Sequence, residues 1–363
     1  LSFSMLPALP AIGSDQYARL HALPKAELHC HLLGTVRKQT FTDLVNAARA
    51  PISEEEIASF YTRGEKPVGV LRVLRALDQW LLRSPDDFHR IAYEYLRDAA
   101  SHTVRYAEFF WNPTGTANVG GLAYSTVLPA LKRAIRDAET DCGIVSRLVP
   151  SIDREASAQA ALEMVQWVTE RRCDEVPGIG MDYRENDHPP EKFTEAYALA
   201  RKHSLKTTAH AGEFGMPWHN VETALKILRV DRIDHGYTII DQPPLVQWVR
   251  EQGVVFTVVP TNSYYLRTLA PERWAQDHPI RAMLSAGLKL HPNTDDPALH
   301  HVTPTGAWQM MMDHFGATWD DVERFMHNGL EAAWIDCSTR QAWKKSWQTE
   351  FSALKPVNEG LNP

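Results

Sequence analysis

Cysteine, excess positive charge and long apolar runs are all scarce in this chain. Its four cysteines in 363 residues stand far apart and form no CxxC pair, which argues against a disulfide framework and favours reduced thiols in a cytoplasmic enzyme. Lys and Arg number 38 against 45 Asp and Glu, a net charge of −7 without a long basic run, which argues against a nucleic-acid partner. The first residues contain neither a basic leader nor a long apolar run, so neither a signal peptide nor a membrane span is expected.

Short β-branched or aromatic runs alternate with amphipathic helical patterns along most of the chain. Eight such runs occur, and several are continuously apolar, as parallel strands buried on both faces should be. Eight strands with intervening helices predict an α/β fold, the (β/α)8 TIM barrel. The expected strands are Ala26–His31, Thr103–Trp111, Gly143–Ile152, Gly178–Tyr183, Leu205–His210, Arg232–Tyr237, Val254–Val259 and Leu288–Pro292.

No composition break or linker divides the chain, so one domain is expected over residues 1–363. Its barrel core would span about 25–300, with extra helices after the first strand and a helical C-terminal tail at about 305–355. The lead before the first strand is expected to be irregular. Expected helices include Thr40–Ala50, Val68–Leu82, a helix from Pro85, and helices near 121–139, 154–171, 190–203, 219–229, 243–252 and 271–286.

The segment KAELHCHLLG, from Lys25 to Gly34, carries two histidines separated by one residue. In a β-strand, residues two apart point to the same face, so His29 and His31 would aim at one spot, as two ligands of one metal would. A chain with 16 His in 363 residues holds about 0.7 such pairs by chance, so the pair gains weight only from other residues.

Further polar residues stand at the C-terminal ends of other expected strands. His210 ends the fifth strand with Glu213 three residues later, His235 ends the sixth, and Asp295 and Asp296 follow the eighth. These ends meet at one mouth of the barrel, where such enzymes place their active sites. Three histidines and one aspartate suit Zn²⁺ or a similar metal with an open position for water. Glu213 would then shuttle a proton, His235 would act as base or orient the water, and Asp296 would support the ligands or accept from substrate.

Each of these residues also has an ordinary structural explanation. A single His at a strand end is more often a hydrogen-bonded or solvated residue, Asp-Asp-Pro is commonly a turn that caps the next helix, and Glu213 could be a first-turn helix acid. The joint arrangement favours catalysis, because each group falls at the same end of the same expected barrel. Five other histidines are interpreted as structural or surface residues: His21, His203, His219, His300 and His301.

Four motifs, KAELHCHLLG, TAHAGE, RIDHGY and NTDDP, occur in this order and resemble those of the adenosine deaminase family of the amidohydrolase superfamily. The resemblance spans nearly all of the chain from Lys25 to about Pro297. It implies one Zn²⁺ per chain, with the ligands His29, His31, His210 and Asp295.

The reaction that this resemblance implies is hydrolytic deamination. An activated water would attack C6 of a 6-aminopurine such as adenosine or a related nucleoside, and ammonia would leave with an inosine-type 6-oxopurine product. Glu213 matches the acid that protonates purine N1, and His235 matches the histidine that positions or deprotonates the water. Asp296 matches the residue that accepts a hydrogen bond from substrate N7 or steadies the water.

Two departures from the family pattern concern the substrate. Leu33 stands where the nucleoside enzymes have an Asp that contacts the ribose 5′-hydroxyl, and this favours a free base or a 5′-altered nucleoside. The segment MDYRENDHPPEKF carries Glu185 and His188 and, with YAEFFWNP, is similar to the adenine deaminase branch, whereas Tyr183 and Arg184 fit neither branch. A deaminase of adenine or modified adenine is therefore the alternative to a nucleoside deaminase. The residues expected at the substrate are Leu33, Asp182, Glu185, Gly212 and Asp296.

Two other functions are left open. A binuclear hydrolase of the dihydroorotase or phosphotriesterase kind would need a bridging Lys late in the fourth strand, and GIGMDY contains none. A catalytically inactive barrel serving as a binding or structural module would be expected to have lost some acid, base or ligand. The expected partners are a small-molecule purine and water, without nucleic acid or membrane, and a homo-oligomer is left open.

Overall fold

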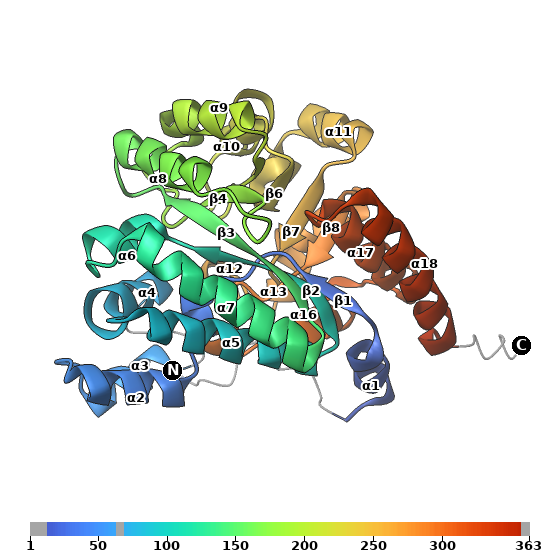
Figure 1. The fold of residues 1–363 in the computed structure, drawn as a ribbon. Coiled ribbons are helices and arrows are strands. Elements are labelled where there is room, and N and C mark those ends of the chain that lie inside the picture. Colours follow the sequence, from blue (N-terminus) through green and yellow to red (C-terminus); the bar gives the residue numbers. More distant parts are fainter. Residues whose placement is uncertain (1–12, 63–68, 357–363) are drawn as a thin grey trace, which may run out of the picture.

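The computed structural model describes residues 13–62 and 69–356 and contains an eight-stranded parallel barrel surrounded by helices (Figure 1). Each strand pairs in parallel with the next along the chain, which confirms the (β/α)8 prediction. Residues 1–12, in which no signal peptide is expected, lie outside the described residues. The strands are β1 (Lys25–Glu27), β2 (Val104–Trp111), β3 (Val145–Asp153), β4 (Gly178–Asp182), β5 (Lys206–Ala211), β6 (Arg232–His235), β7 (Val255–Val258) and β8 (Lys289–Pro292).

The insertion after β1 is helical, as expected. Its last helix begins at a capping box, in which Ser84 Oγ accepts from the Asp87 N–H and the Asp87 carboxylate accepts from the Ser84 N–H. The expected helix Val68–Leu82 starts outside the described residues at Val68, and its last turn is wound more loosely, as a π-helix. The elements are η1 (Leu32–Thr35), α2 (Lys38–Ala48), α3 (Glu54–Phe60), α4 (Val70–Ala76), η2 (Leu77–Leu81) and α5 (Pro85–Ser101).

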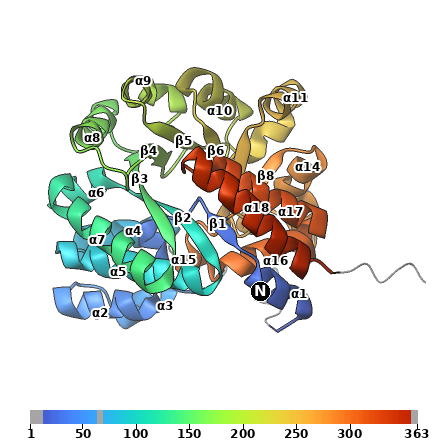
Figure 2. The same cartoon turned by 45° about the vertical axis from the view of Figure 1, so that its right-hand side comes forward.

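Helices connect the remaining strands on the outside of the barrel (Figure 1). They are α6 (Pro113–Asn118), α7 (Tyr124–Cys142), α8 (Ala158–Glu170), η3 (Pro190–Phe193), α9 (Thr194–Lys202), α10 (Trp218–Thr223), η4 (Ala224–Leu228), η5 (Tyr237–Asp241), α11 (Pro243–Gln252), α12 (Ser263–Thr268), α13 (Trp274–Asp277), α14 (Pro279–Ser285) and α15 (Pro297–His300). The C-terminal helices follow as α16 (Pro304–Phe315), α17 (Trp319–Ala332) and α18 (Cys337–Leu354), and α17 packs on β8 and β1 (Figure 2).

Two expectations about helices are wrong. The lead is not irregular throughout, because α1 (Asp15–Ala22) begins where Ser14 Oγ accepts a hydrogen bond from the Tyr17 N–H. The helix expected at 271–286 is split into α13 and α14, since His278 leaves the helical conformation and Pro279 starts the second helix. The helix expected at 219–229 is present, as α10 followed by a π-helical turn, η4.

The first strand is shorter than expected, because β1 ends at Glu27 rather than at His31. Beyond it the Leu28 N–H donates to the Asn293 side chain instead of to a backbone carbonyl. The segment nevertheless stays between its two neighbours: Cys30 O accepts from the Phe110 N–H of β2, and isolated bridges join Cys30 to Asp295 and His31 to Phe110. Successive side chains therefore continue to point to opposite faces of the barrel wall through His29, Cys30 and His31.

Backbone hydrogen bonds close the barrel between the segments that follow β1 and β8, and we call this region the seam. The Asp295 N–H donates to His29 O at 3.0 Å, and the His31 N–H donates to Asp295 O at 2.8 Å. The buried Glu27 carboxylate crosses the seam and accepts from both the N–H and the hydroxyl of Thr294. Asp295 adopts a left-handed φ of 64°, which Asp tolerates better than most residues.

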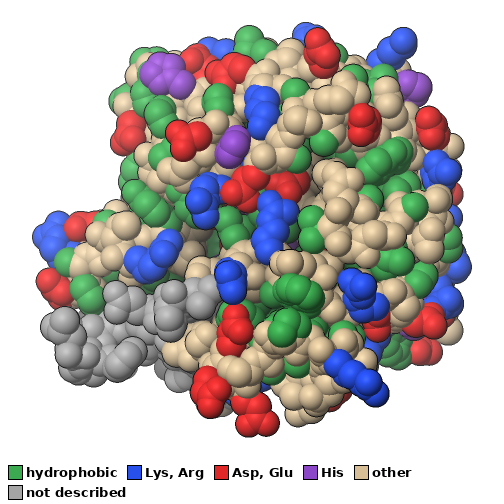
Figure 3. Space-filling model, turned by 90° about the vertical axis from the view of Figure 1, so that its left-hand side faces the viewer, with side chains coloured by type: hydrophobic (Ala, Val, Ile, Leu, Met, Phe, Trp, Pro, Cys, Tyr) green, Lys and Arg blue, Asp and Glu red, His purple; other side chains and the backbone are tan. Residues whose placement is uncertain are grey.

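On the face of the molecule shown in Figure 3, acidic and basic side chains are interspersed and do not form large patches of one sign. In the part of the chain that the structure describes, no helix combines the length and apolarity that a membrane crossing requires.

Candidate metal centre and active site

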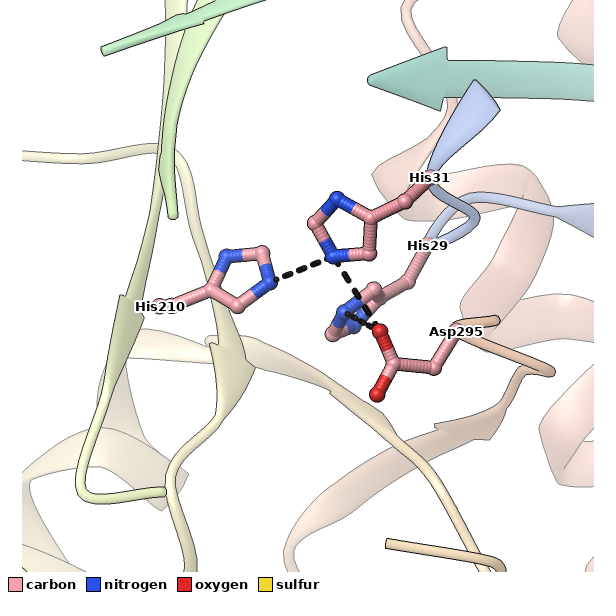
Figure 4. Close-up of side chains that lie close together, drawn as sticks. All are labelled: His29, His31, His210 and Asp295. Carbon is pink, nitrogen blue, oxygen red and sulfur yellow. Dashed lines mark hydrogen bonds and ion pairs between the residues drawn. The ribbon is translucent and has the colours of Figure 1, made fainter. Parts of the chain in front are cut away.

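Three imidazoles and one carboxylate converge at the C-terminal mouth of the barrel (Figure 4). His31 Nε2 lies 3.1 Å from His210 Nε2 and 3.1 Å from Asp295 Oδ1, and His29 Nε2 lies 3.5 Å from Asp295 Oδ1. Ligands of a tetrahedral zinc with bonds near 2.1 Å are separated by about 3.4 Å. The spacing of these four residues therefore fits one metal ion.

The far ring nitrogen of each imidazole faces an acceptor. His29 Nδ1 lies 3.2 Å from Thr257 O, His31 Nδ1 lies 3.2 Å from Asp182 Oδ2, and His210 Nδ1 lies 3.3 Å from Asp234 Oδ2. A carbonyl or carboxylate oxygen can only accept, so each Nδ1 carries the proton and each Nε2 offers a lone pair to the centre. His29 Nε2 is buried and has no hydrogen-bond partner among the residues that the structure describes.

The charge balance of the cluster also favours a cation. Burial disfavours the charged form of His31, yet its contacts with Asp182 and Asp295 raise the pKa of this imidazole well above its ordinary value. A positive charge between these two carboxylates is therefore stabilised. A bound metal ion would provide that charge while His31 stays neutral. Donor type, spacing, tautomer and charge all fit a zinc ion held by His29, His31, His210 and Asp295.

Glu213 and His235 lie beside this cluster. Glu213 Oε2 is 3.5 Å from His235 Nε2, while Glu213 Oε1 accepts a hydrogen bond of 3.1 Å from the Asn262 amide. Tyr237 Oη accepts from the Val259 N–H and donates to Val259 O, so the proton of its contact with His235 Nδ1 comes from the imidazole. His235 Nε2 therefore carries no proton, and its lone pair faces the Glu213 carboxyl.

The two groups have opposite pKa shifts. Burial raises the pKa of Glu213 well above its usual value, and the charges of Asp295 and Glu185 raise it further. Burial and the neighbouring His29 and His210 lower the pKa of His235 well below its usual value. These shifts favour the protonated, neutral form of Glu213 and the neutral form of His235, whose Nε2 then keeps its lone pair.

Asp296 follows Asp295 and packs against Gly34. A Cβ added to Gly34 would lie 1.8 Å from Asp296 Oδ1, so only glycine leaves room for this carboxylate. Leu33, the preceding residue, is buried in η1. The seam thus brings the residues expected at the substrate, Leu33 and Asp296, from opposite ends of the chain into neighbouring positions.

The other residues expected at the substrate have partners within the protein. Asp182 Oδ1 accepts from the Asn112 amide, and its Oδ2 faces His31, on the side of the ring away from the metal ligands. Glu185 accepts from the N–H groups of Gly212 and Glu213. Several buried polar residues around the site could not be singled out from the sequence. The only sign of them there is a polar residue at or near the end of an otherwise apolar strand. They are Asp234, Thr257, Asn262, Tyr237 and Arg154.

The comparison with protein families decides the relationship, because the family model described as adenosine deaminase matches residues 24–346. The chain belongs to the adenosine deaminase family. Among curated members, the adenine deaminase of Streptomyces coelicolor is 33% identical over 322 residues, which are 88% of this chain and 93% of that protein. An uncharacterised deaminase of Schizosaccharomyces pombe is 32% identical over 342 residues, 92% of this chain and 97% of that protein.

Two solved structures are similar to this one over nearly the whole chain. An amidohydrolase from Burkholderia ambifaria with bound zinc is 58% identical with a TM-score of 0.94, covering 96% of this chain and 97% of that one. An adenine deaminase from Arthrobacter aurescens is 26% identical with a TM-score of 0.81, covering 90% and 98%. With the metal-binding geometry of its mouth, this family member is a zinc-dependent hydrolytic deaminase.

The carboxylate behind His210 gives a test of the metal centre. We expect Asp234→Asn to weaken zinc binding by about 10- to 100-fold, because the amide no longer draws the proton to His210 Nδ1. The measurement is zinc affinity by competition with a chromogenic chelator. Asp231→Asn is the matched control, since Asp231 lies just before β6 and binds Thr207 and Lys206 instead. Equal zinc affinity in the Asp234 variant and the wild type would contradict the assignment.

Proposed function

We propose that this deaminase acts on adenine or a modified adenine base rather than on adenosine. Two observations support the free base. Curated relatives of about one-third identity are named adenine deaminase, and Leu33 offers no hydrogen bond where the nucleoside enzymes contact ribose. The alternative raised by the sequence therefore fits better than the nucleoside deaminase expected first.

We assign His29, His31, His210 and Asp295 as the ligands of one zinc ion, on the convergence of their donor atoms within 4.8 Å of one another. Held by these residues, a zinc ion would lower the pKa of a bound water and would supply a nucleophile near neutral pH. The observation that carries the reaction class is the placement of the Glu213 carboxyl and the His235 imidazole side by side, 3.5 Å apart, next to these ligands.

Glu213 is the acid in this proposal. Asn262 holds Oε1 by donating to it, so the proton of the neutral carboxyl belongs on Oε2, the oxygen that faces His235. From there it is delivered to N1 of the purine, which makes the neighbouring C6 more electrophilic. His235 takes a proton from the attacking water on Nε2, and its imidazole is held by Tyr237. Asp296 accepts a hydrogen bond from the N7–H tautomer of a free base, or it steadies the water.

A substrate panel tests the free-base assignment. Adenine, N6-substituted adenines, adenosine, 2′-deoxyadenosine and 5′-modified adenosines are compared by the ultraviolet change on deamination. We expect a free base to have a kcat/KM at least about 100-fold above that of adenosine, because the ribose gains no polar contact from Leu33. Enzyme stripped of metal by a chelator is the control and regains turnover with added zinc. Preference for unmodified adenosine would contradict the assignment.

Substitution of the acid tests the mechanism. We expect Glu213→Gln to keep its zinc, because Glu213 is not among the four ligands, and to lose about 10²- to 10⁴-fold in kcat, because an amide cannot pass on the proton. Zinc content and steady-state kinetics are measured together on the preferred substrate. Glu222→Gln, on the outer surface of α10, is the control with the same change of side chain. Activity near the wild-type level in the Glu213 variant would place the acid elsewhere.

A further inference from the structure

Glu185, in the loop after β4, is a buried carboxylate whose acceptors are used by the protein itself. It is 1% exposed. Oε1 accepts from the Gly212 N–H at 2.8 Å and from the Asn220 amide at 2.8 Å, and Oε2 accepts from the Glu213 N–H at 2.9 Å. A carboxylate accepts about four hydrogen bonds, so little capacity is left for a ligand.

The two backbone donors belong to the turn that carries the acid. Gly212 adopts a left-handed φ of 67° directly after β5, and a Cβ there would lie 2.6 Å from Thr238 Oγ1. This conformation takes the Gly212 and Glu213 N–H groups out of the strand and turns both toward one anion. Buried N–H groups without an acceptor are costly, so the turn depends on the Glu185 carboxylate.

Arg154, directly after β3, holds the same turn from its other side. The guanidinium is fully buried and donates to His210 O at 2.8 Å through Nη1. Its Nε and Nη2 both donate to His188 O, in the loop that contains Glu185. Arg154 thus fixes the backbone carbonyl of His210, and Glu185 fixes the backbone N–H of Glu213. The two buried side chains carry opposite charge.

We propose that Glu185 is a positioning residue that fixes the backbone of Gly212 and Glu213, and so aims the Glu213 carboxyl, without touching the substrate. The role of Glu213 as acid rests on the proposed function, whereas the hydrogen bonds of Glu185 do not. A residue that aims the acid affects the chemical step, and a displacement of about 1 Å costs about 10²-fold in rate. A residue that contacts the purine affects KM and the choice of substrate instead.

Residue-resolved hydrogen exchange on the zinc-loaded enzyme tests this directly, with no substrate present. In the wild type the Gly212 and Glu213 amides are expected to exchange slowly. Glu185→Ala removes the acceptor, so both amides should exchange at least 10-fold faster. Glu185→Gln keeps one acceptor oxygen, so one of the two amides should stay protected. Glu191→Gln, from η3 near this loop, is the control, because its exposed carboxylate binds Thr223 and neither amide.

Unchanged exchange of both amides in a folded, zinc-loaded Glu185→Ala protein would overturn the proposal. If that variant fails to fold, Glu185→Gln decides, and protection of both its amides would overturn the proposal equally. The kinetic arm uses the best substrate of the wild type. We expect kcat to fall by about 100-fold in the alanine variant with KM changed less than 3-fold, and a raised KM at unchanged kcat would show a substrate contact instead.

The two arms separate this inference from the proposed function. If the wild type deaminates no purine, the proposed substrate class fails, and hydrogen exchange still decides whether Glu185 holds the turn. If purines are deaminated and the exchange is unchanged, the positioning role fails and the proposed function stands.

Discussion

Backbone hydrogen bonds across the seam between β1 and β8 are the constraint on which the site depends. Asp295 both donates to His29 and accepts from His31, so the residues that close the barrel also carry three of the four proposed ligands. Glu27 and Asn293 reinforce the seam by bonding to backbone groups on the opposite segment. A slip of one residue here would turn the histidines to the other face of the barrel wall and separate them from Asp295.

Acceptors behind the imidazoles convert this closure into a coordination site. Thr257, Asp182 and Asp234 come from β7, β4 and β6, and each offers an acceptor to the Nδ1–H of one ring, which leaves the Nε2 lone pair facing inward. The same arrangement recurs at His235, where Tyr237 fixes the tautomer. Each metal-ligating imidazole is therefore oriented by an acceptor on a different strand from the one that carries or precedes the imidazole. His235 is the exception, because Tyr237 lies only two residues away in the sequence.

Much of the site could be predicted from the sequence, because the face to which a strand residue points and the place where a strand ends are both local features. His29 and His31 share a face although β1 is short, since alternation continues through Cys30 in hydrogen bonds to both neighbours. Pro279 was a readable break in the helix expected at 271–286. Glu185 could not be interpreted locally, because its role depends on amides 27 and 28 residues away.

Residues that support the site were harder to find than those that form it. Asp234 stands next to His235 in the sequence, yet its partner is His210, on the neighbouring strand. Asn262 ends a segment, VVPTN, that contains no recognisable motif, and its contact with Glu213 arises from the order of strands around the barrel. Long-range pairings of this kind are set by topology and not by spacing along the chain.

Metal content with X-ray absorption at the zinc edge tests the central claim most directly. The account predicts one zinc per chain after loading, with three imidazole nitrogens and oxygen in its coordination shell and no sulfur. Two metals per chain with a metal–metal distance of about 3.5 Å would indicate a binuclear hydrolase and contradict the account. Sulfur in the coordination shell would contradict it as well, since Cys30 lies between the two histidines and is assigned no metal contact.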